Sequence, residues 1–182
     1  MVELPDYGTL DERLDSLGYS RIDPTSVMAV ALADRDFPEH DEVRLADGFY
    51  REWIDGFISA NRLEGRGDAA RKILGGIAAE TIVASIAVNG DAVGFGFGAL
   101  EGDHVGLFDI FVKQDYRGRG NGRKILETVL HAAKAKGAAT GYLQVMDNNL
   151  PARSLYEALG FGRLYGYWYR KGDAAGQEGA RY

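Results

Sequence analysis

The sequence lacks cysteine, long hydrophobic runs and an excess of basic residues, with 21 Lys and Arg against 27 Asp and Glu. Without cysteine the chain has no disulfide, no thiolate metal site and no cysteine nucleophile. No segment reaches the ~18 apolar residues of a membrane-spanning helix, and the first residues lack the basic and apolar regions of a signal peptide. We therefore expect a cytoplasmic protein without a membrane partner.

Charge and composition narrow the class of protein. A net charge of -6 argues against broad nucleic-acid binding, which needs a basic face to neutralise phosphates, and suits a basic amine as substrate. With 46% hydrophobic and 26% charged residues, the chain has the composition of a folded globular protein. Its 182 residues suit one large domain or one domain with an appendage.

Hydrophobic spacing and turn residues predict the elements. Apolar residues at helical spacing predict helices at 9–17, 49–60, 69–78, 125–136 and 152–159. Thr9 and Glu12 fit a capping box that opens the first helix. Alternating or β-branched segments predict strands at 25–32, 81–88, 92–100, 105–112, 142–146 and 165–171. Asn89-Gly90 predicts a tight hairpin, and the acidic stretch 34–41 predicts an irregular loop.

A glycine-rich segment, Arg117-Gly118-Arg119-Gly120-Asn121-Gly122, lies between a predicted strand and a predicted helix. Glycines let backbone N–H groups approach an anion, and the helix N-terminus favours negative charge. The Walker A pattern fails because position 123 is arginine rather than glycine. The dinucleotide pattern fails for the same reason, and hairpin strands rather than a βαβ unit precede the loop. The segment is therefore neither of these two nucleotide loops, and from the residues alone it is either a cradle for another pyrophosphate or a purely structural turn.

The segment 107–122 resembles motif A of the GNAT superfamily (GCN5-related N-acetyltransferases). Its signature, Gln/Arg-x-x-Gly-x-Gly/Ala, is matched by Arg117, Gly120 and Gly122. The resemblance implies acetyl-CoA as co-substrate and no metal. It implies that backbone groups of the strand bind the pantetheine arm and that the loop amides hold the pyrophosphate. The cofactor-binding residues implied are Phe111, Val112, Arg117, Gly118, Arg119, Gly120, Asn121, Gly122, Arg123 and Asn149.

Two residues depart from the family pattern. Asn121 stands where an aliphatic residue is common, and Gln114 stands where proline is usual. Neither change removes an amide that the pyrophosphate needs.

The segment 149–161 resembles motif B of the same family, Asn-x-x-Ala-x-x-Leu-Tyr-Glu-x-x-Gly-Phe. By that resemblance Asn149 reaches the amide-bearing arm of the cofactor, and the Tyr156 hydroxyl points at its sulfur. A phenol with a reference pKa of ~10 keeps its proton at neutral pH, so Tyr156 is the predicted general acid. From the residues alone, Tyr156 could equally be a half-buried core tyrosine and Asn149 a helix N-cap.

The resemblance covers residues 49–171 and implies an α/β (α+β) fold, with a mixed, mostly antiparallel twisted sheet flanked by helices. It also implies direct attack of a neutral amine on the thioester within a ternary complex, with backbone N–H groups steadying the oxyanion. The acceptor is a small molecule, a peptide or a protein N-terminus. The alternative function is a CoA- or acyl-CoA-binding sensor or interaction module without catalysis.

The general base is identified less sharply. Period-2 alternation places Asp109 on the same strand face as Leu107 and Phe111, where apolar neighbours would raise its pKa. A structural, hydrogen-bonded aspartate is the alternative. Glu101 is the second candidate, or else part of an exposed hairpin tip. If water relays the proton away from the substrate ammonium, neither Asp109 nor Glu101 is needed as a strong base.

A short similarity links the two ends of the chain, since Leu17-Gly18-Tyr19-Ser20-Arg21 parallels Leu159-Gly160-Phe161-Gly162-Arg163. In that register Tyr7 and Leu14 replace Asn149 and Tyr156, so the first copy lacks the chemistry. We predict that residues 1–33 resemble the end of a decayed first GNAT half, that 34–171 form the acetyltransferase domain and that 172–182 are a disordered tail. A tandem origin requires 25–32 to be a strand of the sheet; chance similarity is the alternative.

The aromatic strand 165–171 also bears on assembly. It either pairs with a second copy in a homodimer or is covered by the chain itself.

Overall fold

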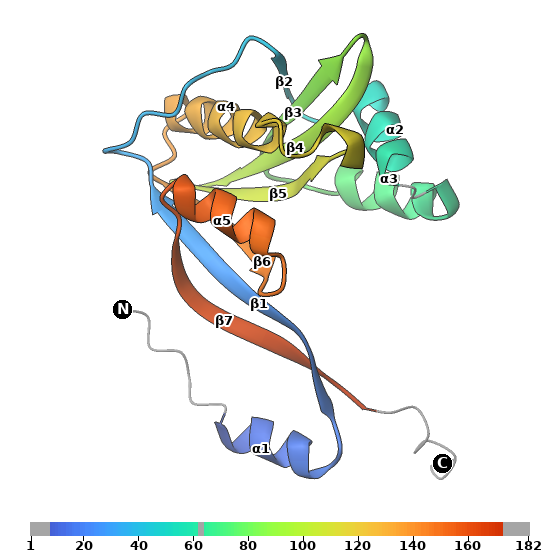
Figure 1. Cartoon of the computed structure of the whole chain (residues 1–182), viewed down its shortest axis with the longest axis vertical. Helices are drawn as coiled ribbons and strands as arrows, with labels where there is room; N and C mark the ends of the chain where they lie inside the picture. The colour runs from blue at the N-terminus through green and yellow to red at the C-terminus, as the bar shows by residue number, and fades with distance from the viewer. Residues whose placement is uncertain (1–7, 62–63, 173–182) are drawn as a thin grey trace.

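The computed structural model describes residues 8–61 and 64–172, and these residues form one seven-stranded sheet flanked by helices on both faces (Figure 1). The strands are β1 (Ser20–Ala31), β2 (Val43–Asp47), β3 (Glu80–Val88), β4 (Asp91–Glu101), β5 (His104–Val112), β6 (Thr140–Met146) and β7 (Gly162–Lys171). The α-helices are α1 (Gly8–Ser16), α2 (Arg51–Ala60), α3 (Gly67–Gly75), α4 (Asn121–Ala135) and α5 (Leu150–Ala158).

The sheet order is β2-β3-β4-β5-β6-β1-β7, and every neighbouring pair is antiparallel except β5 and β6. The predicted fold class is therefore confirmed. Within the described ranges, no helix is long and apolar enough to cross a membrane.

Each face of the sheet has its own apolar core. On one face, α4 and α5 pack over a large cluster that includes Met28, Ile125 and Leu143. On the other face, α2 and α3 enclose an aromatic cluster around Trp53, whose indole N–H donates to the Ala84 carbonyl at 2.8 Å. The aromatic spacing that predicts α2 thus corresponds to a buried face.

Local signals locate most elements, with a few differences. The β3–β4 turn has positive φ at Asn89 (53°) and Gly90 (88°), as the Asn-Gly hairpin requires. Helix α1 begins at Gly8, so Thr9 lies inside its first turn and does not cap it. Helix α3 ends at Gly75, before the predicted limit, and β2 was not predicted. The tail from residue 173 onward lies outside the described residues.

Strand β1 joins the N-terminal segment to the sheet. It lies between β6 and β7 and pairs with both, with Thr25 opposite Met146 on one side and Tyr167 on the other. In Figure 1, β1 and β7 continue side by side as a twisted ribbon that leaves the rest of the sheet and carries α1 at its far end. Asp11 holds α1 there by accepting hydrogen bonds from Trp168 and Arg170.

The acidic stretch does not extend freely into solvent. Residues 33–42, here called the α4 strap, run along the outer side of α4 toward its N-terminus (Figure 1). The strap is held by the pairs Lys134–Arg35, His131–Phe37, Thr128–His40, Glu127–His40 and Lys124–Glu42. Its Phe37 side chain, 4% exposed, joins the core beneath α4.

We expect Phe37→Ala to lower the free energy of unfolding by about 3–5 kcal/mol, because it leaves a cavity beneath the α4 strap. Denaturant unfolding measures the change. Ile73→Ala is the control, since Ile73 is 69% exposed on α3 and its truncation should cost no more than ~0.5 kcal/mol. Equal effects of the two variants would mean that the strap does not pack as described.

Candidate active site

The parallel strands β5 and β6 separate soon after they meet. They pair only between 104–106 and 140–142. Beyond this point β5 follows β4 as far as Val112, while β6 follows β1 as far as Met146. Among the residues that the structure describes, the two facing edges beyond this point therefore carry backbone N–H and C=O groups without a strand partner. Because α4 follows β5 and α5 follows β6, both helix N-termini lie at the end where the strands diverge.

A β-bulge in β5 lies at the divergence. Phe97 pairs with Phe108 and Phe95 pairs with Phe111, so Asp109 and Ile110 together oppose one residue of β4. Asp109 adopts a left-handed conformation, with φ of 51°, which is uncommon for a residue with a side chain.

The bulge corrects the predicted alternation along β5. Leu107 packs in the core beneath α4, whereas Phe111 packs with the aromatic cluster on the opposite face. The extra residue reverses the side-chain order, so Asp109 does not share a face with both. Surrounding protein atoms partly desolvate its carboxyl and raise its pKa above the usual value, although the residue keeps contact with solvent.

The glycine loop enters α4 through two left-handed residues, Gly118 (φ 70°) and Gly120 (φ 80°). Such angles favour glycine at both positions. Gly120 caps α4, whose first turn contains no acidic residue. The N-terminal amides of α4 thus lack both an intrahelical acceptor and a competing carboxylate, which favours an anion.

Two side chains fix the loop from within. Arg117 donates from Nε to the Val112 carbonyl at 2.9 Å, and its guanidinium lies 5.9 Å from the ring centre of Phe111. Asn121, buried at the start of α4, donates from Nδ2 to the Tyr116 carbonyl at 3.0 Å. The polar residue that departs from the family pattern therefore ties the two ends of the loop together.

Helix α5 presents the residues of the second motif. The Asn149 side chain accepts from the Ala152 amide at 3.3 Å, so it is an N-cap, as the residue pattern allows. Tyr156 packs in the core and is 8% exposed. Within the described residues, the Tyr156 hydroxyl makes no hydrogen bond, yet every fully buried side-chain oxygen there has a partner. The hydroxyl oxygen is therefore not fully buried. Desolvation of the side chain raises the pKa of this phenol.

A cavity of about 540 Å³ joins these features. It lies between the end of β5, the glycine loop and the start of α5. Its lining comprises Ile110, Phe111, Val112, Tyr116, Arg117, Gly118, Gly120, Asn121, Gly122, Arg123, Asn149, Pro151, Ala152, Leu155 and Tyr156. All the residues of the predicted cofactor set except Arg119 are among them, together with Tyr156.

Several lining residues are outside the predicted site set. Ala152 and Leu155 are matched positions of the second motif and lie about one helical turn or less from Tyr156, so the motif and helical spacing could have found them. Ile110 enters through the bulge and Tyr116 through the turn before the glycine loop, and no residue pattern indicates either.

The two candidate bases occupy different places. Asp109 lies in the bulge, directly before lining residue Ile110. Glu101 lies at the tip of the β4–β5 hairpin, where it pairs with His104. At ~3.3 Å per residue along a strand, the pair Glu101 and His104 is roughly 25 Å from Val112 at the other end of β5.

Residues 39–161 match the model of the acetyltransferase (GNAT) family. The chain belongs to this family. It is 42% identical over 66 residues to a thialysine N-epsilon-acetyltransferase of Bos taurus and 38% identical over 73 residues to the ribosomal protein bS18-alanine N-acetyltransferase of Escherichia coli K12. These segments cover 36% and 40% of this chain, but only 39% and 49% of the two relatives.

Solved GNAT structures share the fold. A tandem GNAT protein of clavulanic acid biosynthesis superposes with a TM-score of 0.69 at 16% identity, over 94% of this chain and 61% of that one. A GCN5-related N-acetyltransferase of Sphaerobacter thermophilus superposes with a TM-score of 0.67 at 16% identity, over 88% of this chain and 55% of that one. These likenesses support the GNAT architecture described above.

We expect Asn121→Ala to lower the free energy of unfolding by about 1–3 kcal/mol, because it leaves the Tyr116 carbonyl without its donor. Thermal or denaturant unfolding measures the loss. Asn148→Ala is the control, since Asn148 is exposed before α5 and its side chain makes no hydrogen bond within the described residues. An Asn121→Ala protein as stable as the control would remove this bond from the account.

Proposed function

We propose that this protein transfers the acetyl group of acetyl-CoA to a primary amine. The observation that carries the proposal is a shared cavity, in which the Tyr156 side chain and the amides of the glycine loop line the space where β5 and β6 diverge. Membership of an acetyltransferase family supports it, as do relatives that are N-acetyltransferases.

Acetyl-CoA fits the cavity by its chemistry. The amides of 118–123, at the N-terminus of α4, suit its pyrophosphate. The unpaired edge of β5 offers backbone groups to the amides of the pantetheine arm, much as another strand would. The side-chain oxygen of Asn149 accepts the helix-cap hydrogen bond from the Ala152 amide, so its side-chain N–H groups are left to donate to the pantetheine arm.

The reaction needs a base and an acid on the two sides of the thioester. Asp109 takes a proton from the substrate ammonium, directly or through water, and the neutral amine then attacks the thioester carbonyl carbon. As the C–N bond forms, the C–S bond breaks and Tyr156 gives its proton to the departing thiolate. The second proton of the acylated nitrogen then passes through water to the Tyr156 phenolate, which leaves a neutral amide and restores the acid. Asp109 suits the base role better than Glu101, because Asp109 directly precedes the cavity-lining Ile110, whereas Glu101 is at the other end of β5.

The environment of Tyr156 fits an acid. Burial raises the pKa of its phenol, so the hydroxyl keeps its proton throughout the neutral and mildly alkaline range. The proton therefore remains available when a thiolate forms beside it.

We expect Tyr156→Phe to lower kcat by about 10-fold to 100-fold with little change in acetyl-CoA affinity, because only the proton donor is lost. Thiol release over a panel of amines measures kcat, and calorimetry measures binding. Leu159→Ile, a core change at the C-cap of the same helix, is the control for altered packing. An unchanged kcat when chemistry is rate-limiting would exclude Tyr156 as the acid, and binding without turnover of any amine by the unmodified protein would favour the non-catalytic module.

A pH profile separates the two candidate bases. The raised pKa of Asp109 means that its base form develops only above that pKa, so kcat at saturating substrates should fall as the pH drops through it. We expect Asp109→Asn to lower kcat by roughly 100-fold and to abolish this acidic fall. Glu101→Gln should keep the kcat of the unmodified protein and its fall at acidic pH. The opposite pattern would assign the base to Glu101, and unchanged profiles in both variants would favour relay by water.

Three further predictions from the sequence extend this proposal. Homodimer formation through β7 is supported by its position at the edge of the sheet and by exposed Trp168 and Tyr169. An origin of residues 1–33 in a first GNAT half is supported by the place of β1 inside the sheet. Cytoplasmic location rests on the sequence alone.

A further inference from the structure

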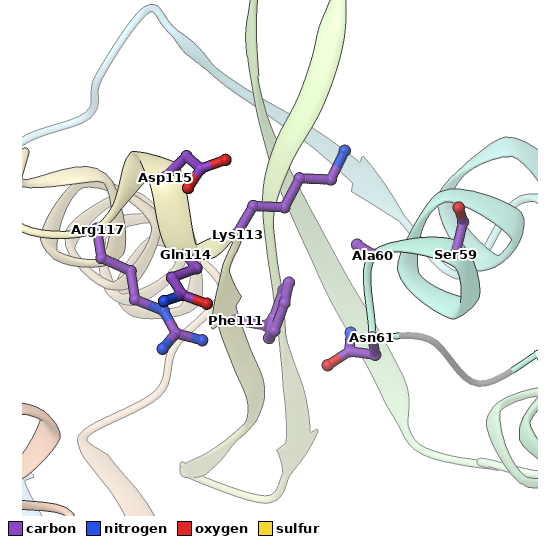
Figure 2. A pocket seen from close by; sticks show the side chains of 8 residues that line it. All are labelled: Ser59, Ala60, Asn61, Phe111, Lys113, Gln114, Asp115 and Arg117. Carbon is purple, nitrogen blue, oxygen red and sulfur yellow. The ribbon is translucent and has the colours of Figure 1, made fainter.

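A second cavity, of about 590 Å³, lies on the other side of β5 and takes no part in the mechanism above. It is bounded by the end of β5, the turn that follows it and the C-terminal end of α2. Its lining comprises Ser59, Ala60, Asn61, Phe111, Lys113, Gln114, Asp115 and Arg117 (Figure 2).

The two cavities meet at the end of β5. Phe111 and Arg117 line both of them. In Figure 2 the Phe111 ring stands in the middle of the second cavity, between the turn that carries Arg117 and the end of α2. Phe111 therefore presents apolar surface to both cavities, and a molecule in the second cavity can contact the same ring that lines the cleft proposed for acetyl-CoA.

Two opposite charges in this cavity have no partner of their own. Within the described residues, neither Lys113 nor Asp115 makes an ion pair or a side-chain hydrogen bond. Figure 2 shows the Lys113 ammonium reaching toward the end of α2, while the Asp115 carboxylate stays on the side of the turn. Separated, unpaired charges of both signs suit a ligand that itself carries both signs.

We propose that this cavity binds the head group of a free α-amino acid whose side-chain amine accepts the acetyl group, with Lys113 binding the α-carboxylate and Asp115 binding the α-ammonium. The inference rests on the proposed function and names its acceptor class. The methylene groups of such an acceptor lie along Phe111, and the terminal amine reaches the thioester. The bonds made and broken are those of the mechanism above, with the acetyl group ending on the side-chain nitrogen.

The charges argue against other acceptors. Arg117, the third charged residue of the lining, already donates to the Val112 carbonyl and lies near the Phe111 ring. A polyanion such as a phosphorylated amine would meet the unpaired Asp115 carboxylate, and a simple diamine would place a second cation beside Lys113 with no carboxylate to bind it. A free amino acid with an amine-bearing side chain satisfies both groups.

Three acceptors of similar length test the inference with the whole chain. L-lysine carries both head-group charges, cadaverine lacks the carboxylate, and 6-aminohexanoate lacks the α-ammonium. We expect kcat/KM for lysine to exceed that for each of the other two by about tenfold or more, since each lost charge removes a charge-assisted hydrogen bond.

Variants assign the two contacts. Lys113→Gln should lose the preference for lysine over cadaverine, and Asp115→Asn should lose the preference for lysine over 6-aminohexanoate. Lys72→Gln on α3 and Asp91→Asn on β4 are matched controls, because both side chains are exposed and unpaired within the described residues. The controls should keep both preferences.

Calorimetric titration with lysine separates the failure of this inference from that of the proposed function. Equal kcat/KM for the three acceptors, or turnover of other amines with no binding of lysine, would overturn the inference and leave the N-acetyltransferase standing. Lysine binding that Lys113→Gln abolishes, without turnover of any amine, would support the subsite and count against the proposed function. Absence of both lysine binding and turnover would overturn both.

Discussion

The separation of β5 from β6 is the constraint on which the rest of the site depends. Strands that continued to pair would fill the sheet with their own hydrogen bonds and leave no edge for a ligand. Here pairing stops at Gly106 and Tyr142, and each strand then follows its outer neighbour. The free edge of β5, the start of α4 and the start of α5 consequently face one cavity.

The N-terminal strand contributes to this separation without lining the cavity. β1 pairs with the whole length of β6, from Thr140 to Met146, and so gives β6 a partner on the side away from β5. On the opposite side, the bulge at Asp109 bends β5 where the strands part. Residues far apart in the sequence thus shape a site whose chemical groups lie mainly between 109 and 156.

Local features of the site were predictable from sequence, and long-range features were not. The glycine loop and the Asn149–Tyr156 pair lie within single strand–loop–helix and loop–helix segments, where motif spacing alone predicts which residues line the cavity. The bulge at Asp109 depends on register against β4, so simple alternation placed Leu107 and Phe111 wrongly on one face. The α4 strap depends on contacts with residues about 90 positions away, which no local pattern reveals.

Amide hydrogen exchange tests the central claim most directly, because it observes the backbone groups that the divergence leaves free. On addition of acetyl-CoA, we expect slower exchange at the amides of 118–123 and at the β5 amides that face β6. A Gly120→Glu protein, which places bulk and negative charge at the pyrophosphate position, should show no such change. Protection confined to other segments, or equal protection in the variant, would contradict the account.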